Sequence, residues 1–393
     1  MRRAIYRSPL QNCFSVVSTF KRALETKLLK IWVFLGIFMG MKKYEITLPK
    51  QLPTEMVNKI AEIDEFKGRW DAIKNIAPDS LSRLHRIATI ASIGSSTRIE
   101  GAQLSDTQVN ELLSHIDRKS FQSRDEEEVA GYAEVMELAF DSAEDITITE
   151  NHIKQMHSIL LKYSSKDSRH KGEYKKHPNN VEAFNANGNS VGVIFKTAEP
   201  FDTPFYMENL VQWYRTEIHA RDYHPLLIIG AFIVHFLAIH PFQDGNGRLS
   251  RVLTTLMLLQ HGYQYVPYCS LESIIEKNKD QYYMALRKAQ KSFAAQHAGM
   301  KDWLSYFLRI LIKQKSILQQ RIEQETQLAL GKLSPTSTQI MQLVCQRQKT
   351  TISDIVELLN INRNTVKKHL KELAAKNLIR QNGTGKGTWY SPA

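Results

Sequence analysis

Apolar residues recur at steps of three and four along most of the chain, the period of an amphipathic α-helix. In residues 51–76 they fall at Met56, Ile60, Ile63, Phe66, Trp70 and Ile73. A second run follows Pro78, with Ser80 as its predicted N-cap and Gly101 near its end. Further helices are predicted over residues 105–118, 125–144, 149–163, 204–219, 225–239, 247–261, 276–290 and 301–330.

One stretch, residues 170–197, breaks this pattern. Its segments 181–184 and 191–195 are short and rich in β-branched or aromatic residues, and the Asn-Ala-Asn-Gly-Asn between them is typical of a turn. The pattern predicts a β-hairpin, which is marginally stable alone and must pack against other elements. It is either a lid or substrate-docking strand, or a decoration. The predicted fold class is therefore mainly α with a small hairpin.

Composition narrows the class of protein. The chain has 393 residues, 42% hydrophobic and 23% charged, which excludes a disordered, collagen-like or multi-span membrane protein and predicts about two or three domains. Cys13, Cys269 and Cys345 are far apart and form no CxxC pair. A zinc ribbon or disulfide framework is therefore not expected, and the reducing cytoplasm is the expected location.

The net charge of +12 lies at the two ends of the chain. Residues 1–40 carry +6, residues 331–393 carry +7, and residues 41–330 carry −1. Any nucleic-acid binding is therefore expected at an end.

The N-terminal residues 1–40 allow three interpretations. Residues 31–41 are an apolar run of eleven, and a bilayer needs about 20, so stable membrane insertion is not expected. In the first, the natural start is Met39 or Met41 and the upstream stretch is not native. In the second, the stretch is a membrane-proximal or signal segment, and in the third it is an ordinary helix.

Residues 240–251 read His-Pro-Phe-Gln-Asp-Gly-Asn-Gly-Arg-Leu-Ser-Arg and follow a strongly apolar helix. Pro241 and the glycines predict a sharp loop, in which residues 245–247 can turn successive N–H groups into an anion nest. A helix begins there and adds partial positive charge, with Arg248 and Arg251 on one face. These features predict a polyphosphate site.

Two more side chains complete the chemistry of this loop. A lone carboxylate beside phosphates, here Asp244, is the usual protein contribution to a Mg²⁺ site. His240 can take a proton at neutral pH, because histidine has an unperturbed pKa of about 6.5. Alone, each feature has an ordinary explanation as a structural histidine, a turn or a helix cap, but their joint spacing predicts nucleotidyl transfer. His235 does not share a helix face with His240, so a zinc site is disfavoured and His235 is expected to pack within its helix.

These residues resemble the Fic (Fido) motif, HxFx(D/E)GNGRxxR, with every fixed position present. The resemblance covers roughly residues 50–310 and implies a protein adenylyltransferase, which transfers AMP from Mg-ATP to a Ser, Thr or Tyr hydroxyl of a target protein or of itself. By this resemblance His240 is the base, Asp244 holds Mg²⁺ and Phe242 anchors the loop in the core. The phosphates are bound by Gly245, Asn246, Gly247, Arg248 and Arg251. The hairpin corresponds to the family's flap, which orients the target by strand addition.

Residues 95–101 read Ser-Ser-Thr-Arg-Ile-Glu-Gly, with Ser96 and Glu100 on one helix face. They form an ordinary helix end with Gly101 as C-cap in one interpretation. A glutamate is unfavourable at a helix C-terminus, which indicates another use. The stretch resembles the (S/T)xxxE(G/N) motif of Fic proteins with an N-terminal inhibitory helix. This resemblance implies that Glu100 pairs with Arg251 and occupies the space of the γ-phosphate.

Residues 334–393 resemble a winged helix-turn-helix domain, with helices from 334, over 351–359 and over 363–376, then a hairpin from Gln381. The third helix presents residues suited to phosphate and base contacts, namely Arg363, Asn364, Lys367, Lys368 and Lys371. The other interpretation is a protein-interaction or dimerisation domain with a solvated basic face.

The predicted organisation is an extension (1–40), a helical region with the inhibitory helix (41–149), a Fic core (150–305), a connecting helix (306–333) and the winged helix (334–393). The first hypothesis is an autoinhibited adenylyltransferase that uses ATP and Mg²⁺. The alternatives are a DNA-binding regulator with the Fic core as sensor, and an enzyme that removes AMP from targets. The candidate partners are a protein substrate, DNA through residues 334–393 and a second copy of the chain.

Overall fold

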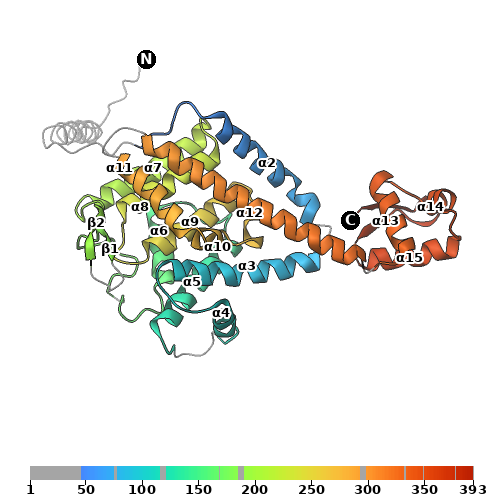
Figure 1. The fold of residues 1–393 in the computed structure, drawn as a ribbon, viewed down its shortest axis with the longest axis horizontal. Coiled ribbons are helices and arrows are strands. Elements are labelled where there is room, and N and C mark those ends of the chain that lie inside the picture. The colour runs from blue at the N-terminus through green and yellow to red at the C-terminus, as the bar shows by residue number, and fades with distance from the viewer. Residues whose placement is uncertain are drawn as a thin grey trace, which may run out of the picture. The chain divides into compact units, whose positions relative to one another are not determined.

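The computed structural model describes residues 46–74, 78–115, 121–167, 169–184, 190–292, 298–331, 333–347, 349–376 and 378–392. Up to residue 331 these residues form packed helices with one small sheet (Figure 1), so the predicted fold class is confirmed. The helices of this part are α2 (Thr54–Lys74), α3 (Pro78–Ile99), α4 (Asp106–Leu113), α5 (Arg124–Asp141), α6 (Glu150–Leu160), α7 (Thr203–Ala220), α8 (Pro225–Ile239), α9 (Asn246–Gln260), α10 (Leu271–Glu276), α11 (Lys279–Ser292) and α12 (Ala298–Gly331).

Helix α8 is at the centre of this packing. Its residues are apolar nearly all round, and those from Leu226 to Ile239 are all buried, as expected for a helix enclosed by others. It packs against α7, α9, α11 and α12, and α12 in turn lies along α2 (Figure 1). The Nε1 of Trp303 in α12 donates to the carbonyl of Gly230 at 2.7 Å. Helix α8 is thereby fixed inside the fold, with His240 directly after its last residue.

The predicted hairpin consists of β1 (Val181–Phe184) and β2 (Ser190–Phe195). The strands pair antiparallel, from Val181 opposite Phe195 to Phe184 opposite Ser190. Strand β2 contacts α11, so the hairpin packs on the helices as expected. Its connecting residues, 185–189, lie outside the described part of the chain.

Two details of the helix prediction were wrong. Helix α3 begins at Pro78, so Ser80 lies inside the helix and is not its N-cap; proline suits the first helical position because its φ is fixed and its N–H is missing. The helix predicted over 276–290 is α11, which begins at Lys279, and the separate helix α10 before it was not predicted. Asn278 ends α10 by donating from Nδ2 to the carbonyl of Ile274 at 2.9 Å, a break that hydrophobic periodicity does not show.

The C-terminal residues form α13 (Pro335–Arg347), α14 (Ile352–Leu359), α15 (Arg363–Ala375), β3 (Ile379–Asn382) and β4 (Trp389–Pro392). Asn360 ends α14 in the left-handed conformation at φ 51°. These elements share a core made of Ile340, Val344, Ile355, Val366, Leu370, Leu373, Leu378, Ile379 and Tyr390. The predicted three helices and wing are therefore present.

The expectations for residues 1–40 fall outside the described residues, as does the end of the helix predicted over 105–118. Within the described residues, no helix is both long and apolar enough to cross a bilayer.

Candidate functional site

The loop between α8 and α9 is closed by its own side chains. The amide of Asn246 accepts from the N–H of Phe242 at 2.9 Å and donates to its carbonyl at 2.6 Å. Gly245 has a φ of 80°, a left-handed conformation suited to glycine, and α9 starts at the next residue. The Phe242 side chain is fully buried, the anchoring position that the resemblance implied.

His157 in α6 supports this loop, and sequence reasoning did not single it out. Its ring stacks on Phe242 with a centroid distance of 3.8 Å. The Gly172 N–H donates to Nδ1 at 3.0 Å, so Nε2 carries the proton that is donated to the Asp244 carbonyl at 3.0 Å. Burial lowers the pKa of His157 to about 4, which keeps it neutral in this role. In the sequence, the only indication of this role is that His157 lies on the apolar face of a short helix.

His240 presents one ring nitrogen to a cavity. Its Nδ1 lies 3.2 Å from the carbonyl of Leu237. Because a carbonyl only accepts, Nδ1 carries the proton of the neutral ring and Nε2 is left as the proton acceptor. Burial lowers the pKa of His240 to about 4. The imidazole is therefore neutral at pH 7, and the lone pair of Nε2 is available to accept a proton.

The cavity has a volume of about 890 Å³ and collects most of the predicted site residues. These are Glu100, His240, Asp244, Gly245, Asn246, Gly247 and Arg248. Much of the remaining lining comes from α11, through residues that include Tyr283, Arg287 and Gln290, and from Asn179 and Asn180 just before β1. The sequence analysis did not select these lining residues of α11, because α11 has the pattern of an ordinary amphipathic helix.

Arg248 is 2% exposed and lies between two carboxylates. It forms ion pairs of 3.1 Å with Asp244 and 3.0 Å with Glu128 of α5. Arg124 pairs with the other Asp244 oxygen at 3.2 Å. Burial acts to raise the pKa of Asp244, but Arg248, the N–H of Gly245 and Arg124 outweigh it and lower this pKa. Asp244 is therefore an anion at the edge of the cavity.

The donor set fits a nucleotide-bound magnesium ion. Asp244 offers carboxylate oxygens, which Mg²⁺ prefers, and phosphate oxygens complete such a site. Across the described ranges, no three or more His, Cys, Asp or Glu side chains are grouped as metal ligands. A Mg²⁺ ion at Asp244 would thus depend on the nucleotide.

The predicted contact between Glu100 and Arg251 is present. Arg251 is 4% exposed; its Nη2 lies 2.8 Å from Glu100 Oε1 and 2.9 Å from the Ser96 carbonyl, and its Nε donates to Ser96 Oγ at 2.8 Å. The Glu100 carboxylate also covers Gly247, since a Cβ there would lie 2.1 Å from Oε1. An anion thus occupies the N-terminus of α9, where helix N–H groups favour negative charge.

The end of α3 is fixed by Arg98, a residue inside the same motif. Its guanidinium binds both Glu276 oxygens, at 2.7 and 3.1 Å, and pairs with Asp106 at 2.9 Å. A third nitrogen donates to the carbonyl of Leu104 at 2.9 Å. These contacts tie the end of α3 to α4 and α10, which the sequence did not indicate.

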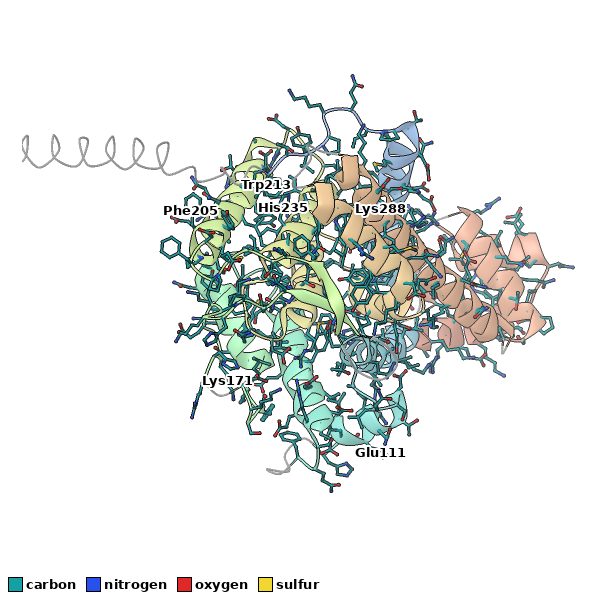
Figure 2. All side chains as sticks on the ribbon, turned by 60° about the vertical axis from the view of Figure 1, so that its left-hand side comes forward. Glu111, Lys171, Phe205, Trp213, His235 and Lys288 are labelled. Atoms are coloured by element: carbon teal, nitrogen blue, oxygen red, sulfur yellow. The ribbon has the colours of Figure 1, made fainter. Side chains whose placement is uncertain are left out.

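His235 is packed inside the fold and does not line this cavity. It is 1% exposed, and Figure 2 shows it among the packed helices. Burial lowers its pKa to about 3. A neutral packed histidine is what the sequence predicted.

The predicted DNA-contact residues lie together on one helix. Arg363, Asn364, Lys367 and Lys368 are all exposed on α15, while Val366 and Leu370 of the same helix are buried. The helix therefore presents a basic, solvent-facing surface, although its role stays a prediction.

Comparisons with known proteins agree with the Fic-like helical part and with the C-terminal helix-turn-helix domain. Residues 147–258 match the Fic/DOC family, and residues 334–381 match the family described as bacterial regulatory protein, arsR family. A relative from Drosophila melanogaster named protein adenylyltransferase Fic is 24% identical over 268 residues, which cover 66% of this chain and 50% of the relative. The chain thus spans about half the length of the curated relatives it matches.

Solved structures support the fold. A Fic domain containing signalling protein from Bacteroides thetaiotaomicron aligns with a TM-score of 0.54 at 24% identity, covering 66% of this chain and 96% of that one. A Fic family protein from Desulfovibrio desulfuricans aligns with a TM-score of 0.56 at 22% identity, and the alignment covers 88% of this chain and 98% of that one. The chain therefore carries a Fic/DOC-family domain followed by a helix-turn-helix domain of the ArsR type.

Proposed function

We propose that this protein is an autoinhibited protein adenylyltransferase. One observation carries the proposal: a neutral His240, the carboxylate of Asp244 and the N-terminus of α9 meet in a single cavity. The names of the curated relatives support the same reaction class.

In the proposed reaction, His240 Nε2 accepts the proton of a Ser, Thr or Tyr hydroxyl. The hydroxyl oxygen forms a bond to the α-phosphorus of ATP, and the bond to the bridging oxygen breaks, so that pyrophosphate leaves with that electron pair. Asp244 would hold Mg²⁺, which supplies positive charge to the phosphates. The N–H groups at the start of α9 stabilise the triphosphate.

We infer that Glu100 inhibits this reaction. Its carboxylate lies against Gly247 and forms an ion pair with Arg251. A phosphate at the N-terminus of α9 would therefore clash with this carboxylate and be repelled by its negative charge. Removal of the carboxylate frees the guanidinium for phosphate.

The test is transfer of label from ATP marked on its α-phosphate. Glu100→Ala should raise protein labelling at least about tenfold, since one charged contact is worth about 1.4 kcal/mol or more. Glu111→Ala, an exposed glutamate of α4, is the matched control and should leave labelling unchanged. Intact-mass spectrometry should show the gain of one AMP. No labelling in any variant would reject the activity, and equal labelling of both variants would reject the inhibition.

We also propose that the C-terminal domain binds double-stranded DNA through α15. The exposed basic residues of this helix support the proposal, because a helix in the major groove with phosphate contacts is the usual arrangement of such domains. Fluorescence polarisation with labelled duplexes should show affinity that falls as salt rises. Binding that is independent of salt, or absent at low salt, would contradict it.

A further inference from the structure

Lys175 is a buried lysine on the segment between α6 and the hairpin, and it is 3% exposed. Its ammonium donates to Asn179 Oδ1 at 2.8 Å, Thr197 Oγ1 at 3.0 Å and the carbonyl of Ile239 at 2.9 Å. The three N–H groups thus have three protein acceptors. A buried charge without such acceptors would be strongly unfavourable, so the arrangement is specific to lysine.

Lys175, Asn179 and Thr197, here termed the flap–loop cluster, join the hairpin to the loop between α8 and α9. Asn179 precedes β1 and Thr197 follows β2, so they mark the two stems of the hairpin. Thr197 Oγ1 donates to Asn179 Oδ1 at 3.0 Å. On the loop side, Asn179 Nδ2 donates to the carbonyls of His240 at 3.2 Å and Phe242 at 2.6 Å. The backbone N–H of Lys175 donates to the carbonyl of Pro241 at 2.8 Å.

The residue that this cluster holds is in an unfavourable conformation. His240 has a φ of 53°, in the left-handed region that non-glycine residues rarely adopt. Such a conformation persists only where the surroundings enforce it. The carbonyls of residues 239–242 each accept a hydrogen bond from Lys175 or Asn179, so the enforcing groups come from these two residues.

We propose that Lys175, acting through the flap–loop cluster, is a positioning residue that holds the imidazole of His240 in its base orientation and couples it to the hairpin. The inference rests on the proposed function, because it assigns His240 the role of base. It goes beyond the motif, since none of the three residues lies within 240–251. The cluster gives the hairpin a direct mechanical link to the base.

The activity test uses proteins that already carry Glu100→Ala. Lys175→Met keeps the length of the side chain and removes its donors, and should lower kcat for adenylyl transfer by at least about tenfold, because a misoriented base loses most of its general-base contribution. Binding of a non-hydrolysable ATP analogue should change less than about twofold. Lys176→Met, an exposed neighbour, is the matched control and should change neither quantity. An unchanged kcat in Lys175→Met would overturn the proposal.

A second readout does not depend on activity. Nitrogen-15 NMR of labelled histidine, with the signal assigned by its loss in His240→Ala, reports the tautomer of His240. The wild type and Lys176→Met should show the Nδ1–H form alone, whereas Lys175→Met should show mixed tautomers or a broadened signal. Thr197→Val, which removes one acceptor, keeps the test available if Lys175→Met does not fold, and should shift the signal in the same direction. If the His240 signal is unchanged in both variants, the positioning role of Lys175 is overturned, whether or not the protein transfers AMP. If the signal changes but no AMP is transferred, only the proposed adenylyltransferase function is overturned.

Discussion

The first turns of α9 and helix α15 both carry pairs of basic residues, but they differ in what those residues contact. In α9, Arg248 and Arg251 are 2% and 4% exposed and are bound to the carboxylates of Glu128 in α5, Asp244 in the preceding loop and Glu100 directly after α3. On α15, Lys367 and Lys368 are exposed, and no ion pair among the described residues involves them.

This difference predicts how each region responds to change. A buried charge depends on a partner from a distant element, and removal of either member leaves the other unpaired. An exposed charge is solvated and available to a ligand, so its removal affects binding without affecting the fold. Changes in the loop and the first turns of α9 should therefore have large effects on activity and stability, and changes in α15 should have small effects on DNA binding alone.

The largest effect is expected at the base. In the Glu100→Ala background, His240→Ala should lower adenylyl transfer by about 100- to 10,000-fold, the usual contribution of a general base. The measurement is the initial rate with labelled ATP. His219→Ala, an exposed histidine of α7, should keep the full rate. A residual rate above one tenth would show that the loop acts without this base.

The next effect is on stability. Arg248→Ala removes the buried partner of both Glu128, which is 9% exposed, and Asp244, and leaves Glu128 only the half-exposed Arg124 at 2.7 Å. It should lower the free energy of unfolding by about 3 kcal/mol. Arg363→Ala on α15 should change it by less than about 0.5 kcal/mol. Urea denaturation followed by circular dichroism compares the two variants. Similar losses would contradict the contrast between buried and exposed charge.

The pH dependence of stability should report the buried histidines. Burial lowers the pKa of His157 and His240 to about 4 and that of His235 to about 3, while the unfolded chain takes up these protons near the ordinary value of about 6.5. Between about pH 4 and pH 6.5 the unfolded state therefore binds more protons than the folded state. Stability is full above about pH 6.5 and falls as pH drops toward 4, by about 1.4 kcal/mol per pH unit for each group.

Thermal unfolding between pH 4 and 7 measures this slope. His157→Phe should reduce the slope because one of the three groups is removed. His219→Gln, at an exposed position, should leave it as in the wild type. A slope that is the same in His157→Phe would show that this histidine does not stay neutral in the folded protein.

The smallest effect is expected on α15. Lys368→Ala should weaken duplex binding about equally for all sequences and reduce the slope of log affinity against log salt by about 1, the value for one lost phosphate contact. The melting temperature should not change. Lys313→Ala, an exposed lysine of α12, serves as the control. An unchanged salt slope would remove Lys368 from the DNA contact.

The local features of the site could be predicted because their causes lie within a few residues. Gly245 turns the loop, Asn246 bonds back to Phe242 four residues earlier, and the helix that follows supplies the N–H groups. The same holds for Ser96 and Glu100, which share a helix face by spacing alone. Helix ends were less predictable, as Asn278 shows, because a break depends on one side-chain hydrogen bond and not on periodicity.

The sequence alone determined the helical class, the hairpin, the loop with its helix and the basic third helix of the C-terminal domain. Only the tertiary structure decided that Glu128 meets Arg248, that His157 supports the loop from 87 residues away, and that Lys175 reaches the carbonyl of Ile239 across 64 residues. The physical reason is that hydrogen bonding and burial act over a few ångströms in space, whatever the separation along the chain. A histidine or lysine that is ordinary by sequence therefore gains its role only from the neighbours that folding gives it.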